Sequence, residues 1–140
     1  MKLGPDSAER IAIESDADVV TARQRARALA VELDMPSTDQ TLLATAISEI
    51  ARNITTYAQR GEVLIDLVRD AQGRRGVRVI ARDHGPGIEN LERALTDGYT
   101  TGGGLGLGLP GARRLVDEFD IQTAPGEGTT VTLIKWTRSG

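Results

Sequence analysis

The chain has 140 residues, of which 39% are hydrophobic and 26% charged, with a formal net charge of −3. This size suits a single domain over residues 1–140, and the composition excludes wholesale disorder. The mild acidity, without a basic run, argues against nucleic acid as a partner. The sequence lacks cysteine, a signal-type apolar run and a membrane-spanning stretch, so we expect a cytoplasmic protein that does not bind membranes.

The first elements are a strand and a helix. Residues 9–14 alternate apolar and charged side chains, which is typical of a half-buried strand. Asp16 or Asp18 can cap a helix that runs to about Glu32, where an Asp-Met-Pro sequence closes it.

A second helix begins at Ser37 or Thr38, and Gly61 ends it. Its apolar residues recur at helical spacing and are expected to face the core: Leu43, Ile47, Ile50 and Ile54. A polar stripe lies beside them: Thr45, Glu49, Asn53 and Thr56. Because such stripes are usually solvated, their position alone does not indicate a function.

The rest of the sequence predicts two hairpins separated by helical segments. The segments follow in order: strands 63–68 and 77–82, a short helix near 91–95, a third helix from Leu107 that carries Phe119 on its apolar face, and strands 121–123 and 129–136. The expected fold is an α+β two-layer sandwich, with about three helices on one face of a mixed, mostly antiparallel sheet.

The first motif that indicates chemistry is Asp83-His84-Gly85-Pro86-Gly87, directly after a strand. Glycines at Gly85 and Gly87 allow a ligand to lie against bare backbone. A carboxylate at a strand end can accept a hydrogen bond from an exocyclic amine such as that of adenine. A tight turn with an incidental aspartate fits this motif alone equally well.

The second motif is a glycine-rich run that opens the third helix: Gly102-Gly103-Gly104-Leu105-Gly106-Leu107-Gly108. Helix N-termini present unpaired N–H groups and partial positive charge, and glycines let phosphate oxygens reach them. The run is neither a Walker A loop, since no Gly-Lys-Ser/Thr follows, nor a Rossmann turn, since no strand closely precedes it. A flexible linker is the alternative, but a linker would not alternate Gly with Leu and continue into a helix.

Glu49 and Asn53 are four residues apart and therefore point the same way from one helix. A Mg²⁺-nucleotide site needs few protein ligands, because the ion keeps waters and phosphate oxygens, and one Asn oxygen suits that need. A nearby carboxylate could accept the proton of an incoming hydroxyl as it attacks the γ-phosphate.

This ordered set resembles the GHKL ATPase/kinase superfamily, whose ATP site is the Bergerat fold. The resemblance covers the chain from about Glu9 to Trp136. Within the superfamily the chain is most similar to the RsbT-type serine/threonine kinases of the stressosome, on two stretches: Ser48-Glu49-Ile50-Ala51-Arg52-Asn53-Ile54 and Gly104-Leu105-Gly106-Leu107-Gly108-Leu109-Pro110-Gly111.

The resemblance implies a role for each motif residue. Glu49 would be the base, Asn53 the Mg²⁺ ligand and Asp83 the residue that reads the adenine amine. Gly85 and Gly87 would shape the base pocket, and Thr129 would support the adenine through water. The phosphates would be lined by Gly102, Gly103, Gly104, Leu105, Gly106, Leu107 and Gly108.

The implied function is an ATP- and Mg²⁺-dependent kinase that phosphorylates STAS-domain scaffold or antagonist proteins of the RsbS and RsbR kind. Once released, it would activate a downstream signalling phosphatase. The alternative is an anti-sigma factor or partner-switching binding module, in which ATP only sets the shape of the protein. A sensor histidine kinase needs a phosphoacceptor histidine, whereas the one histidine, His84, lies inside the adenine motif.

Overall fold

The computed structural model describes residues 8–85 and 108–137, and the fold is built from the elements in these two ranges. In chain order they are β1 (Glu9–Ile13), α1 (Asp16–Glu32), α2 (Ser37–Tyr57), β2 (Gly61–Arg69), β3 (Arg75–Asp83), α4 (Gly108–Leu115), β4 (Glu118–Thr123) and β5 (Thr129–Trp136). The helix predicted near residues 91–95 lies outside the described ranges.

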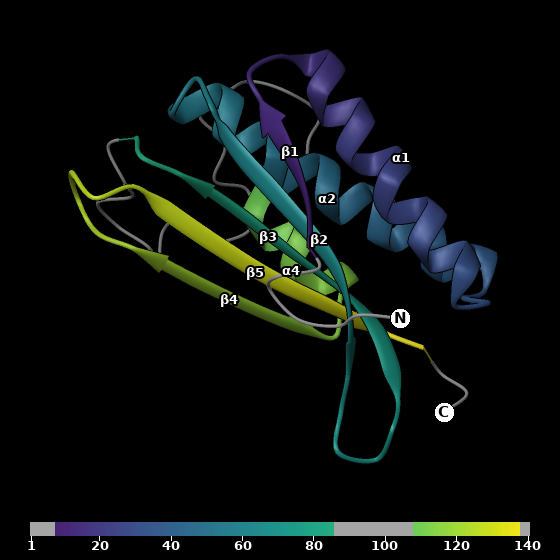
Figure 1. The fold of residues 1–140 in the computed structure, drawn as a ribbon. Coiled ribbons are helices and arrows are strands. Elements are labelled where there is room, and N and C mark those ends of the chain that lie inside the picture. Colours follow the sequence, from purple (N-terminus) through teal and green to yellow (C-terminus); the bar gives the residue numbers. More distant parts are fainter. Residues whose placement is uncertain (1–7, 86–107, 138–140) are drawn as a thin grey trace.

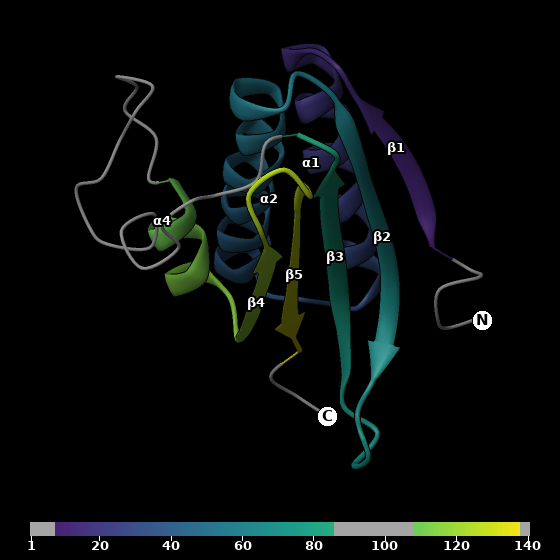
Figure 2. The ribbon, with the colours of Figure 1, turned by 90° about the vertical axis from the view of Figure 1, so that its left-hand side faces the viewer.

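The strands form one five-stranded sheet in the order β1-β2-β3-β5-β4. Helices α1, α2 and α4 pack against one face of it, and no helix of the described residues covers the opposite face, called the open face below (Figures 1 and 2). The predicted α+β two-layer sandwich is therefore confirmed. All four strand pairings among the described residues are antiparallel, in keeping with the expected mostly antiparallel sheet.

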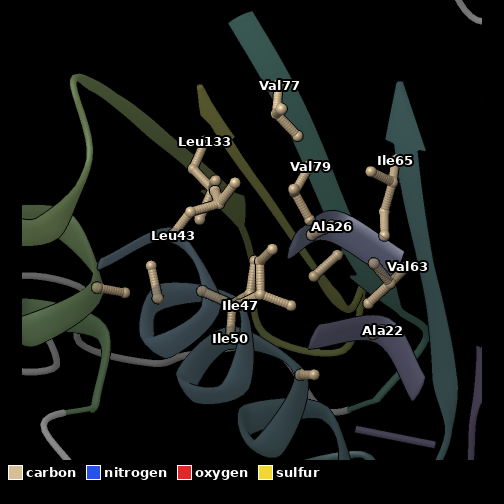
Figure 3. Close-up of a cluster of buried hydrophobic side chains, with 14 of the residues drawn as sticks. Ala22, Ala26, Leu43, Ile47, Ile50, Val63, Ile65, Val77, Val79 and Leu133 are labelled. Carbon is tan, nitrogen blue, oxygen red and sulfur yellow. The ribbon is translucent and has the colours of Figure 1, made fainter. Parts of the chain in front are cut away.

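The core lies between α2 and the three central strands. Figure 3 shows the α2 side chains directed toward the valines of β3 and toward β5. The side chains at its centre are 0–1% exposed: Leu43, Ile47, Ile50, Val63, Ile65, Val77, Val79 and Leu133. Burying a side chain of this size contributes about 1.5–3 kcal/mol, so this layer fixes α2, and every residue on it, relative to the strand ends.

Helix α1 packs through small residues. Ala22, Ala26 and Ala30 are fully buried at spacings of four, which lets the helix backbone approach α2 and the sheet closely. Ser15, rather than the expected aspartates, occupies the N-cap position, and the Asp18 carboxylate instead accepts a hydrogen bond from the Glu14 amide at 2.9 Å.

Helix α2 ends earlier than the sequence predicted, at Tyr57 rather than at Gly61. The chain leaves the helix through Gln59, whose φ of +71° is left-handed. Gly61 has a different role, as the first residue of β2. A Cβ on Gly61 would lie 2.4 Å from the Arg82 carbonyl oxygen and 2.9 Å from Ile54 Cγ2, so glycine is needed for α2 to pack on the strand ends.

The end of α4 also differs from the prediction. The apolar spacing placed Phe119 on the third helix, but α4 stops at Leu115 and Phe119 lies in β4, paired with Leu133 of β5. The Asp117 amide donates to the Ile134 carbonyl at 3.1 Å, which turns the chain from helix into strand. Strand β4 therefore begins at Glu118, three residues before the predicted start.

An ion cluster joins three strands on the open face of the sheet. Glu62 of β2 accepts hydrogen bonds from Arg10 of β1 and Arg82 of β3. The bond from Arg10, with the one from Arg82, holds the pKa of Glu62 below its usual range, against the opposing effect of burial. A lowered folded-state pKa stabilises the protein above the unfolded-state pKa, and this contribution is lost as the pH falls through the folded value.

Candidate functional site

Asp83 and Thr129 lie side by side at one end of the sheet. Asp83 is the last residue of β3, and its register partners are Gly61 at the start of β2 and Thr129 at the start of β5. Both side chains are buried, at 8% and 6% exposure, on the same face as the core residues Ala81 and Val131. This pairing joins residues 46 positions apart in the chain and puts an acidic and a hydroxyl group in one place.

The Asp83 carboxylate is oriented by the loop that follows it. Its Oδ1 accepts a hydrogen bond from the Gly85 amide at 2.9 Å. Thr129 Oγ1 is 2.9 Å from Thr123 Oγ1, across the β4–β5 hairpin. Each predicted adenine-site side chain is thus held by a short local contact, which limits the entropy lost when a ligand binds.

Two glycines let the backbone close around Asp83. A Cβ on Gly85 would lie 2.6 Å from the Ala58 Cβ, so this loop packs directly on the residue that follows α2. A Cβ on Gly128 would lie 2.2 Å from the Asp83 carbonyl oxygen, and Gly128 has a φ of +83°. The turn before β5 therefore packs directly on the Asp83 backbone, a contact that the sequence analysis did not predict.

We expect Gly128→Ala to be markedly less stable than Gly126→Ala. Gly126, in the same turn, has a φ of +80° but nothing within 4 Å of an added Cβ. Both substitutions incur left-handed strain of about 1–2 kcal/mol. Only Gly128→Ala adds a backbone collision, with an overpacking cost of about 1–3 kcal/mol. Urea unfolding measures the difference, and equal free energies of unfolding would show that the contact with Asp83 is unimportant.

Glu49 is buried, at 9% exposure, although it belongs to a polar stripe of the kind that is usually solvated. Its Oε2 accepts a hydrogen bond from the Gly108 amide at 2.8 Å, and its Oε1 accepts one from Arg52 Nη1 at 3.2 Å. Gly108 is the first residue of α4 and has a φ of +66°. A carboxylate thus occupies the N-terminus of the helix that the sequence predicted as an anion site, which is where helix N–H groups favour negative charge.

Helix α2 connects the Asp83–Thr129 pair with the N-terminus of α4. Asn53 is half-buried one turn after Glu49, and it directly precedes Ile54, which packs at the start of β2 beside Asp83. The residue after the helix, Ala58, contacts the Gly85 loop. Helix α2 therefore positions Glu49 at the N-terminus of α4, and its C-terminal end packs against the loop that follows Asp83.

Several predicted site residues lie outside the described ranges, and their predicted phosphate- and base-pocket roles stay predictions. They are Gly87, Gly102, Gly103, Gly104, Leu105, Gly106 and Leu107. Of the phosphate motif, Gly108 is described, and its amide donates to the Glu49 carboxylate at the helix start.

Arg52 is a neighbour of Glu49 that sequence reasoning did not single out. The signal was present, since an arginine three residues after a glutamate on a helix can reach it. Arg52 Nη1 lies 3.2 Å from Glu49 Oε1. The arginine side chain is half-exposed, and the glutamate side chain is 10% exposed.

A cavity of about 360 Å³ lies at the other end of the sheet. It is lined by Arg74, Asp117, Lys135, Trp136 and Thr137, none of which the sequence assigned to a site. Since Trp136 pairs with Gly76 whereas Thr129 pairs with Asp83, this cavity is separated from the candidate site by the length of β3.

The described part of the chain has neither a cluster of metal-ligating side chains nor a membrane-spanning helix. Residues 8–85 and 108–137 contain no group of three or more His, Cys, Asp or Glu side chains placed to hold a metal ion. The Asn53 amide oxygen is a hard neutral donor of the type that Mg²⁺ accepts alongside phosphate oxygens, so the residue present fits the predicted ion. Among the described helices, none is long and apolar enough to cross a membrane.

Most of the chain matches a known protein family. The model of the histidine kinase-, DNA gyrase B- and HSP90-like ATPases matches residues 38–138, which include both Glu49 and Asp83. The chain belongs to this ATPase family. The membership in the GHKL superfamily that the ordered set of motifs predicted is therefore confirmed.

Relatives narrow the assignment. Over 128 residues the chain is 47% identical to the serine/threonine-protein kinase RsbT of Bacillus subtilis (strain 168), covering 91% of this chain and 96% of that protein. It is 33% identical over 121 residues to the anti-sigma F factor of Anoxybacillus flavithermus, covering 81% of each. The predicted similarity to RsbT-type kinases is confirmed, and with it the predicted enzyme class, a protein serine/threonine kinase.

Solved structures show the same fold. A Mycobacterium tuberculosis protein with RsbU and RsbW domains matches with a TM-score of 0.57 and 23% identity over 94% of this chain, which spans about a third (34%) of that one. The mycobacterial sensor histidine kinase MprB matches with a TM-score of 0.51 and 17% identity, over 93% of this chain and 99% of that one. At these identities the likeness establishes the fold alone.

Proposed function

We propose that this chain transfers the γ-phosphate of ATP to a serine or threonine of a STAS-domain partner of the RsbS or RsbR kind. In this proposal it works in the cytoplasm as part of a partner-switching stress-signalling complex, and once released it activates a downstream phosphatase. The observation that carries the proposal is the buried Glu49 carboxylate at the N-terminus of α4. The 47% identity to RsbT supports the choice of partner class.

Each predicted site residue has a role in this proposal. The Asp83 carboxylate accepts a hydrogen bond from the adenine amine, and Thr129, its neighbour on β5, supports the base through water. Gly85 and Gly87 shape the base pocket, while residues 102–108 bind the phosphates. Asn53 holds Mg²⁺, which when bound neutralises charge on the phosphate oxygens.

Glu49 performs the proton transfer. As the partner's hydroxyl oxygen bonds to the γ-phosphorus, the bond from that phosphorus to the bridging oxygen breaks and ADP leaves. The hydroxyl proton goes to the Glu49 carboxylate. Burial suits this role, because a carboxylate with few water contacts is better oriented toward one proton donor, and a positioned base typically contributes about 10²–10⁴ in rate.

A second candidate function is a binding module that sequesters a partner and uses ATP as a conformational ligand. The similarity to anti-sigma F factors favours this alternative. Glu49 distinguishes the two functions, because a pure binder has no need of a proton acceptor beside the phosphates.

Incubation with γ-labelled ATP and purified STAS-domain proteins encoded nearby tests the proposal. We expect label on a serine or threonine of one partner, mapped by mass spectrometry. A partner that binds the chain in an ATP-dependent way without acquiring label would favour the binding module instead.

A further inference from the structure

The Glu49 carboxylate is held from two sides by different kinds of donor. The Gly108 amide of α4 donates to Oε2 at 2.8 Å, and the Arg52 guanidinium on α2 donates to Oε1 at 3.2 Å. Together the two bonds fix the plane of the carboxylate between the helices, since each oxygen has its own partner.

The two donors differ in what else they can bind. The Gly108 N–H lies at the start of α4, where unpaired amides and the helix dipole favour any anion that approaches. An amide that turns toward a phosphate oxygen weakens its bond to Glu49. Arg52 belongs to the same helix as Glu49, so its bond depends only on α2, which the core holds rigidly.

We propose that Arg52 is a positioning residue for Glu49. Its guanidinium holds Oε1 so that Oε2 stays directed toward the N-terminus of α4 whether or not Gly108 donates to it. This inference rests on the proposed function, in which Glu49 is the base. Arg52 itself acts only through the carboxylate.

If Arg52 only formed an ion pair with Glu49 and did not position it, Arg52→Gln would leave the rate of phosphoryl transfer unchanged. Glutamine keeps an N–H donor that can reach Glu49, and pairs three residues apart on a helix add little stability, so we expect the Tm of Arg52→Gln to stay within about 2 °C of the wild type in either case. The two interpretations differ in rate, because misplacing a reacting group by about 1 Å can cost about 10²-fold.

The test compares Arg52→Gln and Arg52→Lys with the wild type in steady-state phosphorylation of a partner. We expect Arg52→Gln to lower kcat by about 10- to 100-fold with the KM for ATP within about twofold. Arg52→Lys should recover part of the loss, since it keeps the charge but not the planar fork. Arg27→Gln, an exposed arginine on α1, is the matched control and should keep the wild-type rate.

A double substitution separates action through Glu49 from independent action. In single-turnover assays Glu49→Gln/Arg52→Gln should be no slower than Glu49→Gln, because residues that act as a unit are not additive. A further loss by the same factor would overturn the positioning role. So would a wild-type kcat in Arg52→Gln, or a raised KM for ATP, which would place Arg52 on the nucleotide.

The same set of variants distinguishes failure of this inference from failure of the proposed function. If Glu49→Gln itself keeps the wild-type rate, the base assignment is wrong and Arg52 has nothing to position. If Glu49→Gln is slow and Arg52→Gln is normal, only the role of Arg52 fails.

Discussion

Glu49→Gln should lower the rate of phosphoryl transfer by about 10²–10⁴ while leaving the affinity for ATP nearly unchanged. Glutamine keeps the size of the side chain and an oxygen that can still accept the Gly108 hydrogen bond, so α4 should stay in place. It cannot take up the proton of the attacking hydroxyl at neutral pH. Calorimetric titration with ATP and a single-turnover transfer assay measure the two quantities separately.

The matched control is Glu32→Gln, at the exposed end of α1. It removes the same charge from a helix without touching α2 or α4, and we expect the wild-type rate. A Glu49→Gln protein that transfers phosphate as fast as this control would contradict the base assignment. A protein that also loses ATP binding would show that Glu49 acts by holding α4 and not by accepting a proton.

Asp83→Asn should weaken ATP binding by about ten- to a hundred-fold. Losing a hydrogen bond between a buried carboxylate and the adenine amine costs about 1–3 kcal/mol, and 1.4 kcal/mol is a factor of ten. Asparagine can still accept the Gly85 amide bond through its oxygen, so the loop should keep its form. The other carboxylate oxygen is replaced by an NH2 group, which cannot accept a hydrogen bond from the adenine amine.

Comparing ATP with GTP sharpens this test, because guanine has a carbonyl where adenine has the amine. The wild type should bind ATP much more tightly than GTP, and Asp83→Asn should reduce the ratio of the two affinities. Asp120→Asn, on the exposed β4 edge, is the control and should bind both nucleotides as the wild type does. An unchanged preference in Asp83→Asn would remove Asp83 from the base pocket.

The elements of the fold were largely predictable because their patterns are local. Alternation identified β1, and the spacing of Leu43, Ile47, Ile50 and Ile54 identified the buried face of α2. Spacing alone placed Phe119 on a helix, because positions 112, 115, 116 and 119 also fit a helical face. The Asp117–Ile134 bond that turns the chain into β4 depends on a distant strand, which no local pattern contains.

The candidate site residues could be named from the sequence, but the contacts between them could not. The sequence named Asp83, Thr129 and Glu49, yet the register that pairs Asp83 with Thr129 depends on how β5 enters the sheet. Burial of Glu49 was equally hidden, since it results from α4 packing beside α2. Glycine patterns predict freedom of the backbone, but the collision that a Cβ on Gly128 would cause is visible only in three dimensions.

The central claim is that this chain moves phosphate from ATP to a hydroxyl of a protein partner. The most direct measurement is the amount of ADP and of phosphorylated STAS-domain protein formed in the same reaction over time. We predict equal amounts of the two, with the phosphate on a mapped serine or threonine. ATP that is bound without turnover, or ADP that appears with free phosphate and an unmodified partner, would contradict it.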